Sequence, residues 1–210
     1  MPSFSSISAS RTSKFTDYVI EMDPNYPSEA TRILVQKMAS KFKIYFSCHV
    51  HSTEICSKIP QDFWPESDPN KGRLEHDFGL VLIWKPIGLD ARLKFKPLKS
   101  DIWGEVNIGR YFCRLFGPLE NLIYDSNQFW IDSILDSLHQ ISHSDNPEIR
   151  SAFVKELCLS KQRPKSLIGL LTLADLCFAS IIYRSKKGGE KNALAQLSSM
   201  FVPIKEIKSR

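Results

Sequence analysis

Thr172 and Asp175 open a strongly apolar stretch, and their spacing constrains the fold more than any other feature of the chain. A threonine and an acidic residue three positions apart can form a capping box. The Thr172 hydroxyl then accepts from a free backbone N–H, and the Asp175 carboxylate reaches back to the N–H of Thr172. Leu171 before the cap and Leu176 after it suit the accompanying hydrophobic staple. We predict a buried helix over 172–183, with a cap worth about 1 kcal/mol.

The hydrophobic pattern changes at Gly117: strand-like and helix-like segments alternate before it, and no strand is expected beyond it. Residues 78–84 are almost continuously apolar, which is typical of a central strand covered on both faces. Residues 91–96 alternate, and we expect them to form a hairpin with that strand. The expected strands are 17–22, 43–50, 78–84 and 91–96. The expected helices are one capped by Ser28, a short irregular one within 52–73, then 104–116, 124–143, 147–159, 172–183 and 192–201.

This order predicts an α+β protein with an N-terminal thioredoxin-like α/β lobe followed by an all-α C-terminal lobe. The first lobe is expected over 16–100, with its closing helix at 104–116, and the helical lobe over 117–210. A serine-rich disordered tail is expected over 1–15. In the second lobe, apolar residues at helical spacing are expected to face the core: Phe129, Trp130, Ile134, Leu138 and Ile141.

Charge and cysteine content argue against several classes of protein. The net charge of +5 comes from 28 basic and 23 acidic residues that are interleaved, whereas nucleic-acid binders gather basic residues on one face. The basic clusters at 161–165 and 184–187 are interpreted as solvated loops. Five scattered cysteines favour a reducing intracellular compartment. No apolar run approaches the roughly 20 residues of a membrane helix, so neither a membrane nor direct nucleic-acid contact is expected.

Several strings resemble known families. SLIGLLTLADL at 166–176 closely resembles the C-terminal lobe of glutathione transferases, and GEVNIGRY at 104–111 is similar to the string that opens a helix in that family. Four strings together look like the family of aminoacyl-tRNA synthetase complex-interacting multifunctional protein 2, from about Asp17 onwards. They are CHVHS at 48–52, FGLVLIWK at 78–85, GEVNIGR at 104–110 and LFG at 115–117.

This resemblance implies a non-catalytic scaffold of the cytosolic multi-synthetase complex in protein biosynthesis, with the nucleus as a second location. The implied partners are the glutathione-transferase-like domain of glutamyl-prolyl-tRNA synthetase and aspartyl-tRNA synthetase. Longer members bind lysyl-tRNA synthetase through an N-terminal extension. Only about 16 residues precede the resembling region here, so binding of that synthetase is not expected. Two docking faces are implied, one around the second and third helices of the first lobe and one around Arg110 and Asp132.

Within that family an arginine on the closing helix and an aspartate on the next helix make reciprocal ion pairs with a partner. Arg110 and Asp132 match these positions, and Asn107, Tyr111 and Arg114 are assigned to the same partner interface. Arginine suits the role because its planar guanidinium binds a carboxylate through two hydrogen bonds. From the spacing alone, an intrachain surface pair worth about 0–1 kcal/mol is the alternative.

An active glutathione transferase is the first alternative function, and tRNA binding by basic loops is the second. In active members an acidic or amide residue and then a serine open the closing helix and hold the γ-glutamyl end of glutathione. Here Gly104 and Glu105 take these places, and the Glu105 carboxylate would repel the ligand's own carboxylate. Active members also carry a cis-proline before the third strand, whereas residues 74–77 contain no proline. Tyr26 and Ser28 are interpreted as a turn residue and a helix cap, so no catalytic or cofactor-binding residue is expected.

No metal site is expected either. His49 and His51 lie on one face of a strand near Cys48 and Cys56, but no second pair with metal-ligand spacing follows. Of the tryptophans, Trp84 and Trp130 are expected in the core, while the roles of Trp64 and Trp103 stay open.

Overall fold

The computed structural model describes residues 15–52, 59, 63–65, 67, 70–96, 99–119, 122–124, 129–144, 146, 148–149, 152–153 and 171–186. Residues 1–14 of the predicted tail, the basic cluster at 161–165, the helix at 192–201, Cys56 and Cys158 lie outside these residues, as do most of 52–73 and 147–159.

A five-stranded sheet forms the first half of the molecule. Its strands are β1 (Asp17–Met22), β2 (Ile44–Val50), β3 (Phe78–Trp84), β4 (Arg92–Lys94) and β5 (Ile102–Trp103), in the order β2-β3-β1-β4-β5. β3 is parallel to both β1 and β2, whereas β4 is antiparallel to β1 and β5 is antiparallel to β4. The four predicted strands are therefore present, and β5 is too short to show an alternating pattern in the sequence.

The predicted hairpin between 78–84 and 91–96 is wrong. Leu82 lies opposite Ile20 of β1, and Ile20 lies opposite Leu93 of β4, so β1 separates β3 from β4. A parallel neighbour needs a crossover of a dozen or more residues, and residues 51–77 are long enough to form one between β2 and β3. The apolar run marks a central strand but does not say which strand it pairs with.

Burial along β3 also differs from the expected cover on both faces. Leu80 and Leu82 are fully buried, whereas Val81 and Ile83 on the opposite face are only half-buried. The helices thus cover one face of the sheet more completely than the other.

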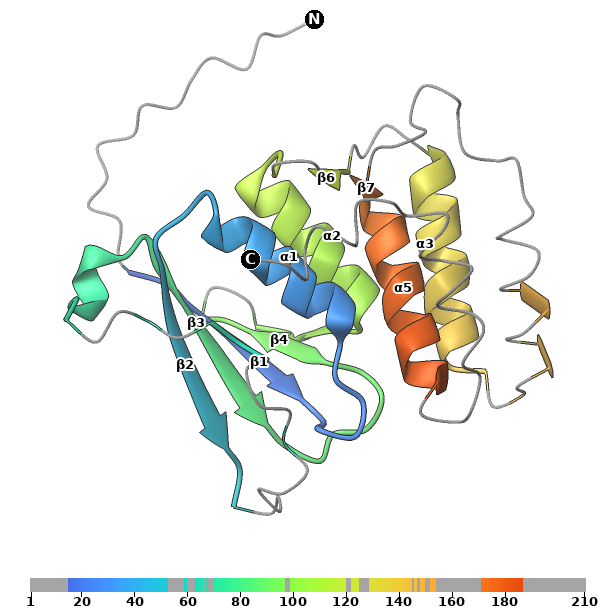
Figure 1. Ribbon diagram of the computed structural model, residues 1–210, viewed down its shortest axis with the longest axis horizontal. Helices are drawn as coiled ribbons and strands as arrows, with labels where there is room; N and C mark the ends of the chain where they lie inside the picture. The colour runs from blue at the N-terminus through green and yellow to red at the C-terminus, as the bar shows by residue number, and fades with distance from the viewer. Residues whose placement is uncertain are drawn as a thin grey trace, which may run out of the picture.

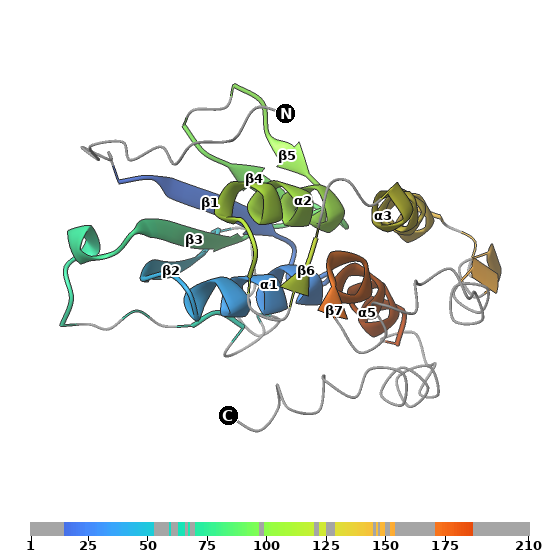
Figure 2. The same ribbon diagram turned by 90° about the horizontal axis from the view of Figure 1, so that it is seen from above.

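Two helices, α1 (Glu29–Ala39) and α2 (Glu105–Phe116), lie together on the covered face (Figures 1 and 2). Ser28 caps α1 as predicted, because its Oγ accepts a hydrogen bond of 3.1 Å from the N–H of Thr31. α2 begins after Gly104 and ends before Gly117, at φ angles of 84° and 69°. Glycine adopts such angles without strain, so both ends of α2 follow from the sequence.

The second half contains α3 (Phe129–Ser142) and α5 (Leu173–Lys186), and α5 packs against both α1 and α3 (Figure 1). A short parallel pair, β6 (Leu122–Ile123) with β7 (Leu171–Thr172), leads into this half. The expectation of no strand beyond Gly117 is therefore wrong, because two-residue strands carry no detectable period.

α3 begins later than predicted, and its core face is shifted. The Phe129 side chain is 87% exposed, so its predicted place in the core is wrong. Ile131 and Leu135 are fully buried, with Leu138 and Ile141 also buried as predicted, while Trp130 packs partly buried against the core. Because residues 129–131 are all apolar, the sequence allows more than one apolar face for this helix. Packing against α5 determines which face is buried.

The predicted capping box is confirmed at the start of α5. The N–H of Asp175 donates to the hydroxyl of Thr172 at 3.2 Å, and the N–H of Thr172 donates to Asp175 Oδ2 at 2.8 Å. Leu171 and Leu176, the predicted staple residues, are both buried.

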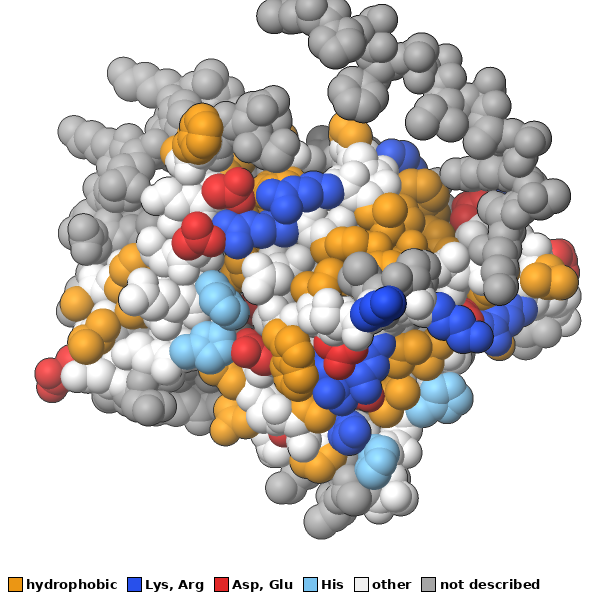
Figure 3. All heavy atoms as spheres, turned by 180° about the vertical axis from the view of Figure 1, so that it is seen from behind, with side chains coloured by type: hydrophobic (Ala, Val, Ile, Leu, Met, Phe, Trp, Pro, Cys, Tyr) orange, Lys and Arg blue, Asp and Glu red, His pale blue; other side chains and the backbone are white. Residues whose placement is uncertain are grey.

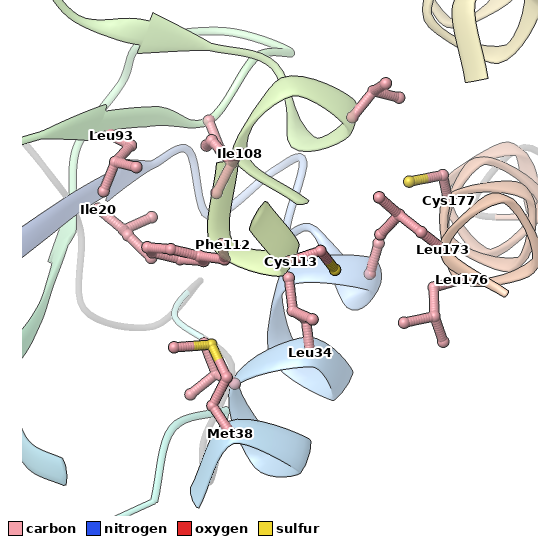
Figure 4. Close-up of a cluster of buried hydrophobic side chains, with 14 of the residues drawn as sticks. Ile20, Leu34, Met38, Leu93, Ile108, Phe112, Cys113, Leu173, Leu176 and Cys177 are labelled. Carbon is pink, nitrogen blue, oxygen red and sulfur yellow. The ribbon is translucent and has the colours of Figure 1, made fainter. Parts of the chain in front are cut away.

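The core is continuous across the predicted boundary between the lobes. It joins side chains from the sheet, α1, α2 and α5: Ile20, Leu93, Leu34, Met38, Ile108, Phe112, Leu173 and Leu176 (Figure 4). The division at residue 117 stays a prediction. The α+β class is confirmed, and no helix in the described part of the chain is long and apolar enough to cross a membrane.

Candidate docking surface

The predicted interface residues of α2 lie on its outward side. Val106, Ile108 and Phe112 turn into the core, which leaves Asn107, Arg110, Tyr111 and Arg114 toward the surface and α3. Helical spacing of three and four residues explains this separation, because residues so spaced share one face. The assignment of these four residues to a partner interface stays a prediction.

Arg110 forms the centre of a charged network between α2 and α3. Its Nε donates to Asp132 Oδ1 at 2.9 Å, and its Nη2 donates to Asp136 Oδ1 at 2.7 Å and to the Asp132 carbonyl at 3.0 Å. Burial lowers the pKa of Arg110, but its hydrogen bonds and its attraction to Asp136 and Asp132 outweigh burial and raise that pKa. Arg110 is therefore held charged and oriented, with only 15% of its side chain exposed.

A second arm of the network reaches Arg114. Arg114 Nη2 donates to the Tyr124 hydroxyl at 2.9 Å, and that hydroxyl donates to Asp132 Oδ1 at 3.2 Å. Burial and the neighbouring charge of Asp132 raise the pKa of Tyr124, so its hydroxyl keeps its proton and donates. Asp132 thus accepts from both arms of the network.

The structure brings Arg110, Asp132 and Arg114 together, but the other two predicted residues contact different groups. Asn107 Nδ2 donates to the Trp103 carbonyl at 2.9 Å. The Tyr111 ring packs against the Phe95 ring, with centroids 5.1 Å apart. These two residues border the network without being part of it.

Asp136 and Tyr124 belong to the network, and the sequence reasoning missed both. The signal for Asp136 was available, because it lies four residues after Asp132 and so on the same helix face. Tyr124 lies before the helix, so only the tertiary structure places its hydroxyl beside Asp132.

Exposed apolar side chains accompany the charged groups on these elements. Phe129 at the start of α3 is 87% exposed, and Leu115 on α2 and Trp103 on β5 are each 45% exposed. The guanidinium carbon of Arg92 lies 4.8 Å from the Trp103 ring centroid. On the face shown in Figure 3, basic, acidic and hydrophobic side chains are interspersed. Aromatic and arginine side chains are enriched at protein–protein interfaces, and Trp103, Phe129 and Arg114 are of these types.

The position expected to oppose glutathione is occupied by the chain's own side chains. Glu105 is buried, and its Oε2 accepts hydrogen bonds of 2.6 Å from the hydroxyls of Ser28 and Ser180. The predicted roles of Ser28 and Tyr26 are confirmed, since Ser28 caps α1 and the Tyr26 N–H donates to the Asp23 carbonyl within the turn. Glu105 therefore serves as an internal acceptor at this helix start.

The segment before β3 is also engaged in the fold. The N–H groups of Asp77 and Gly79 donate to the carbonyls of Lys43 and Thr16 at 2.7 and 2.9 Å. Among the described residues no peptide bond is cis. These backbone donors are committed to the sheet, so a peptide ligand could pair with them only by displacing sheet contacts.

The remaining sequence-based candidates have structural explanations. Trp84 is buried in the core as predicted, Trp64 is also buried, and Trp103 is half-exposed beside Arg92. Within the described part of the chain, His49 and His51 do not belong to a group of three metal ligands. They lie at the end of the edge strand β2.

Comparison with known proteins adds two findings. Residues 13–102 match a family described as a thioredoxin-like domain, which confirms the predicted class of the first lobe. Aminoacyl tRNA synthase complex-interacting multifunctional protein 2 from Cricetulus griseus is 26% identical over 178 residues, 82% of this chain and 53% of that protein. This chain is similar to that family of proteins. The bovine (Bos taurus) relative of the same name is 28% identical over 171 residues, 79% of the chain and 52% of the relative. The Homo sapiens relative is 26% identical over the same length. The chain spans about half the length of these relatives.

Proposed function

We propose that this chain is a non-catalytic docking module that binds aminoacyl-tRNA synthetases in a multi-synthetase complex, through the surface formed by Arg110, Asp132 and Asp136. The similarity to proteins named for interaction with that complex, over about four fifths of the chain, carries the proposal. The proposed partners are aspartyl-tRNA synthetase and the glutathione-transferase-like domain of glutamyl-prolyl-tRNA synthetase. The proposed location is the cytosol, with the nucleus as a second site.

Reciprocal ion pairing is the proposed mode of docking. Asp136 is 70% exposed and so offers a carboxylate to an incoming arginine, whereas Arg110 and Asp132 are 15% and 28% exposed. A partner that presents its own arginine and aspartate could exchange intrachain pairs for interchain pairs. Because the Asp136 carboxylate is exposed, its pair with Arg110 contributes only about 0–1 kcal/mol and is the easier of the two to exchange.

Nearby exposed side chains could provide the apolar part of the interface. Interface energy is concentrated in a few aromatic and arginine side chains at the centre of a contact. Phe129, Leu115 and Trp103 are the large exposed apolar side chains on α3, α2 and β5. The charged network would then set register and specificity, which is the usual contribution of charge at an interface.

Two features support a non-catalytic role. Glu105 occupies the helix start with an internal carboxylate that already binds two serine hydroxyls. The backbone donors before β3 are used within the sheet.

Two alternative functions make different predictions. An active transferase would be retained on immobilised glutathione and turn over a generic electrophile. A tRNA-binding domain would show affinity that falls steeply with salt.

The decisive experiment reverses the charged pair. In the double variant Arg110→Asp with Asp132→Arg, an ion pair can still form within the chain, but each charge presented to a partner is inverted. We expect recovery of synthetases from cytosol by pull-down to fall at least tenfold, and a thermal melt by circular dichroism checks that the variant is folded at the assay temperature.

Arg32→Ala is the control, because Arg32 forms an ion pair with Glu29 within α1, outside the proposed surface. We expect that variant to recover synthetases normally. Normal recovery by the charge-reversed variant would reject this surface, and recovery of the wild-type chain without any synthetase would reject the docking role itself.

A further inference from the structure

Asp90, His139 and His143 form a cluster at the junction between the sheet and α3. One candidate ligand atom from each residue lies within 4.8 Å of the other two. Asp90 belongs to the connection between β3 and β4, whereas His139 lies in the last turn of α3 and His143 directly follows that helix. Residues four apart share one face of a helix, so both imidazoles can reach the same point. The face in Figure 3 shows two neighbouring histidine side chains close to an acidic side chain.

The hydrogen bonds of His143 orient its ring as in metal-binding histidines. Its Nδ1 lies 2.7 Å from the carbonyl oxygen of His139, and its Nε2 lies 2.7 Å from Asp90 Oδ2. Metal-ligating histidines usually donate one ring N–H to a carbonyl or carboxylate, which points the other nitrogen at the metal. A neutral ring that donates from Nδ1 places a lone pair on Nε2, opposite the Asp90 carboxylate. A metal cation between these two atoms would take the place of the hydrogen bond that they share.

The backbone at the start of α2 packs against the other two residues of the cluster, His139 and Asp90. A Cβ atom at Gly104 would lie 2.9 Å from His139 Cε1 and 3.4 Å from Asp90 Oδ1, so the backbone packs directly on both side chains. The Gly104 N–H also donates to the carbonyl of Ala91, the residue after Asp90, at 2.9 Å. His139 and Asp90 are only partly exposed. Three separate segments therefore form the cluster, which restricts how far its side chains can move apart.

We propose that Asp90, His139 and His143 bind one divalent transition-metal ion of the Zn²⁺ class, which ties α3 to the connection before β4. Two imidazole nitrogens and one carboxylate oxygen are a donor set that zinc accepts, and with three protein ligands a water takes the fourth position. Hard ions such as Mg²⁺ and Ca²⁺ prefer all-oxygen ligands and fit this set poorly. Zinc bonds of about 2.0–2.2 Å require ligand atoms roughly 3.3 Å apart, which small side-chain rotations can reach. The site is independent of the docking proposal.

Calorimetric titration of the chelator-treated full-length chain with Zn²⁺ tests the site. We expect the double variant His139→Gln with His143→Gln to bind one zinc ion fewer than the wild type. We expect Asp90→Asn to weaken that site at least tenfold. The matched control is His49→Gln with His51→Gln, which removes one histidine from the end of β2 and one that directly follows it, and should leave the stoichiometry unchanged. Equal binding by the wild type and the His139/His143 double variant would overturn the proposal.

Two further measurements keep the outcome unambiguous. Co²⁺ replaces Zn²⁺ with visible absorption, and a cysteine ligand would add an intense thiolate charge-transfer band in the near ultraviolet. We expect visible bands that the histidine substitutions remove, without the thiolate band; a thiolate band that survives those substitutions would assign the metal to cysteines instead. Zn²⁺ should also raise the melting temperature of the wild type and of the β2 control, but not that of the His139/His143 variant. If the His139/His143 variant fails to fold, the titration of Asp90→Asn tests the site instead. An affinity of that variant for Zn²⁺ equal to that of the wild type would contradict the site.

Discussion

The Oε2 atom of Glu105 accepts a hydrogen bond of 2.6 Å from the hydroxyl of Ser180. Glu105 is the first residue of α2, and Ser180 lies in α5, so this contact crosses the predicted boundary between the lobes. The same oxygen accepts from Ser28 at the start of α1. One buried carboxylate therefore connects three helices.

Replacing this carboxylate should destabilise the fold. Glu105→Ala leaves the Ser28 and Ser180 hydroxyls without this acceptor in a buried position, which costs about 1–3 kcal/mol. We expect a lower urea midpoint for unfolding, with a smaller loss for Glu105→Gln, because the amide oxygen can still accept. A midpoint for Glu105→Ala equal to that of the wild type would show that the contact contributes nothing to stability.

The capping box gives a second prediction. Thr172→Ala removes the acceptor for the Asp175 N–H and should lower the free energy of unfolding by about 0.5–2 kcal/mol. Thr172→Ser keeps a hydroxyl at the same position and should retain most of that stability. Guanidinium unfolding of the two variants measures the difference, and an equal loss for both would point to the methyl group of Thr172 rather than the cap.

Close packing of α2 against α5 gives a third prediction, in which one substitution changes the free energy of unfolding in opposite directions in two backgrounds. A Cβ atom at Gly109 would lie 2.8 Å from Leu173 Cδ1, and Leu173 is only 1% exposed. Overpacking of about 1–3 kcal/mol should exceed the roughly 1 kcal/mol that alanine gains over glycine in a helix. Gly109→Ala should therefore destabilise the wild type but stabilise the Leu173→Ala background. Denaturant unfolding of the four proteins of this double-mutant cycle checks the reversal, and a loss of the same size in both backgrounds would contradict it.

Glu21 gives a prediction about pH. Burial raises the pKa of Glu21, but hydrogen bonds and charges from Lys94 and Arg92 outweigh burial and hold that pKa below its ordinary value of 4.5. A depressed pKa in the folded state stabilises the protein above pH 4.5, and this contribution is lost as pH falls toward the folded value. Glu21→Gln should be less stable than the wild type at pH 7, and the gap should narrow below pH 4.5. Urea unfolding at several pH values measures this gap, and a constant difference would assign the effect to packing.

Local features of the sequence predict much of this structure correctly. The caps at Ser28 and Thr172 and the glycines that end α2 concern residues within a few positions of one another, so residue type and spacing suffice to find them.

Contacts between distant segments were beyond sequence reasoning. The apolar run at 78–84 identifies a central strand, but its insertion between β1 and β2 depends on the path of the crossover. The cluster of Asp90 with His139 and His143 was likewise only partly visible in the sequence. Its two histidines have visible helical spacing, while their meeting with Asp90 requires the folded chain.

The sequence by itself determined where β1 to β4 lie, how α1 and α5 begin, where α2 begins and ends, and the α+β class. The tertiary structure decided the strand order, the place of Glu105 between three helices, and which charges surround Arg110. The reason is physical: hydrophobic periodicity and capping act over a few residues. Pairing and packing depend on which distant surfaces exclude water together.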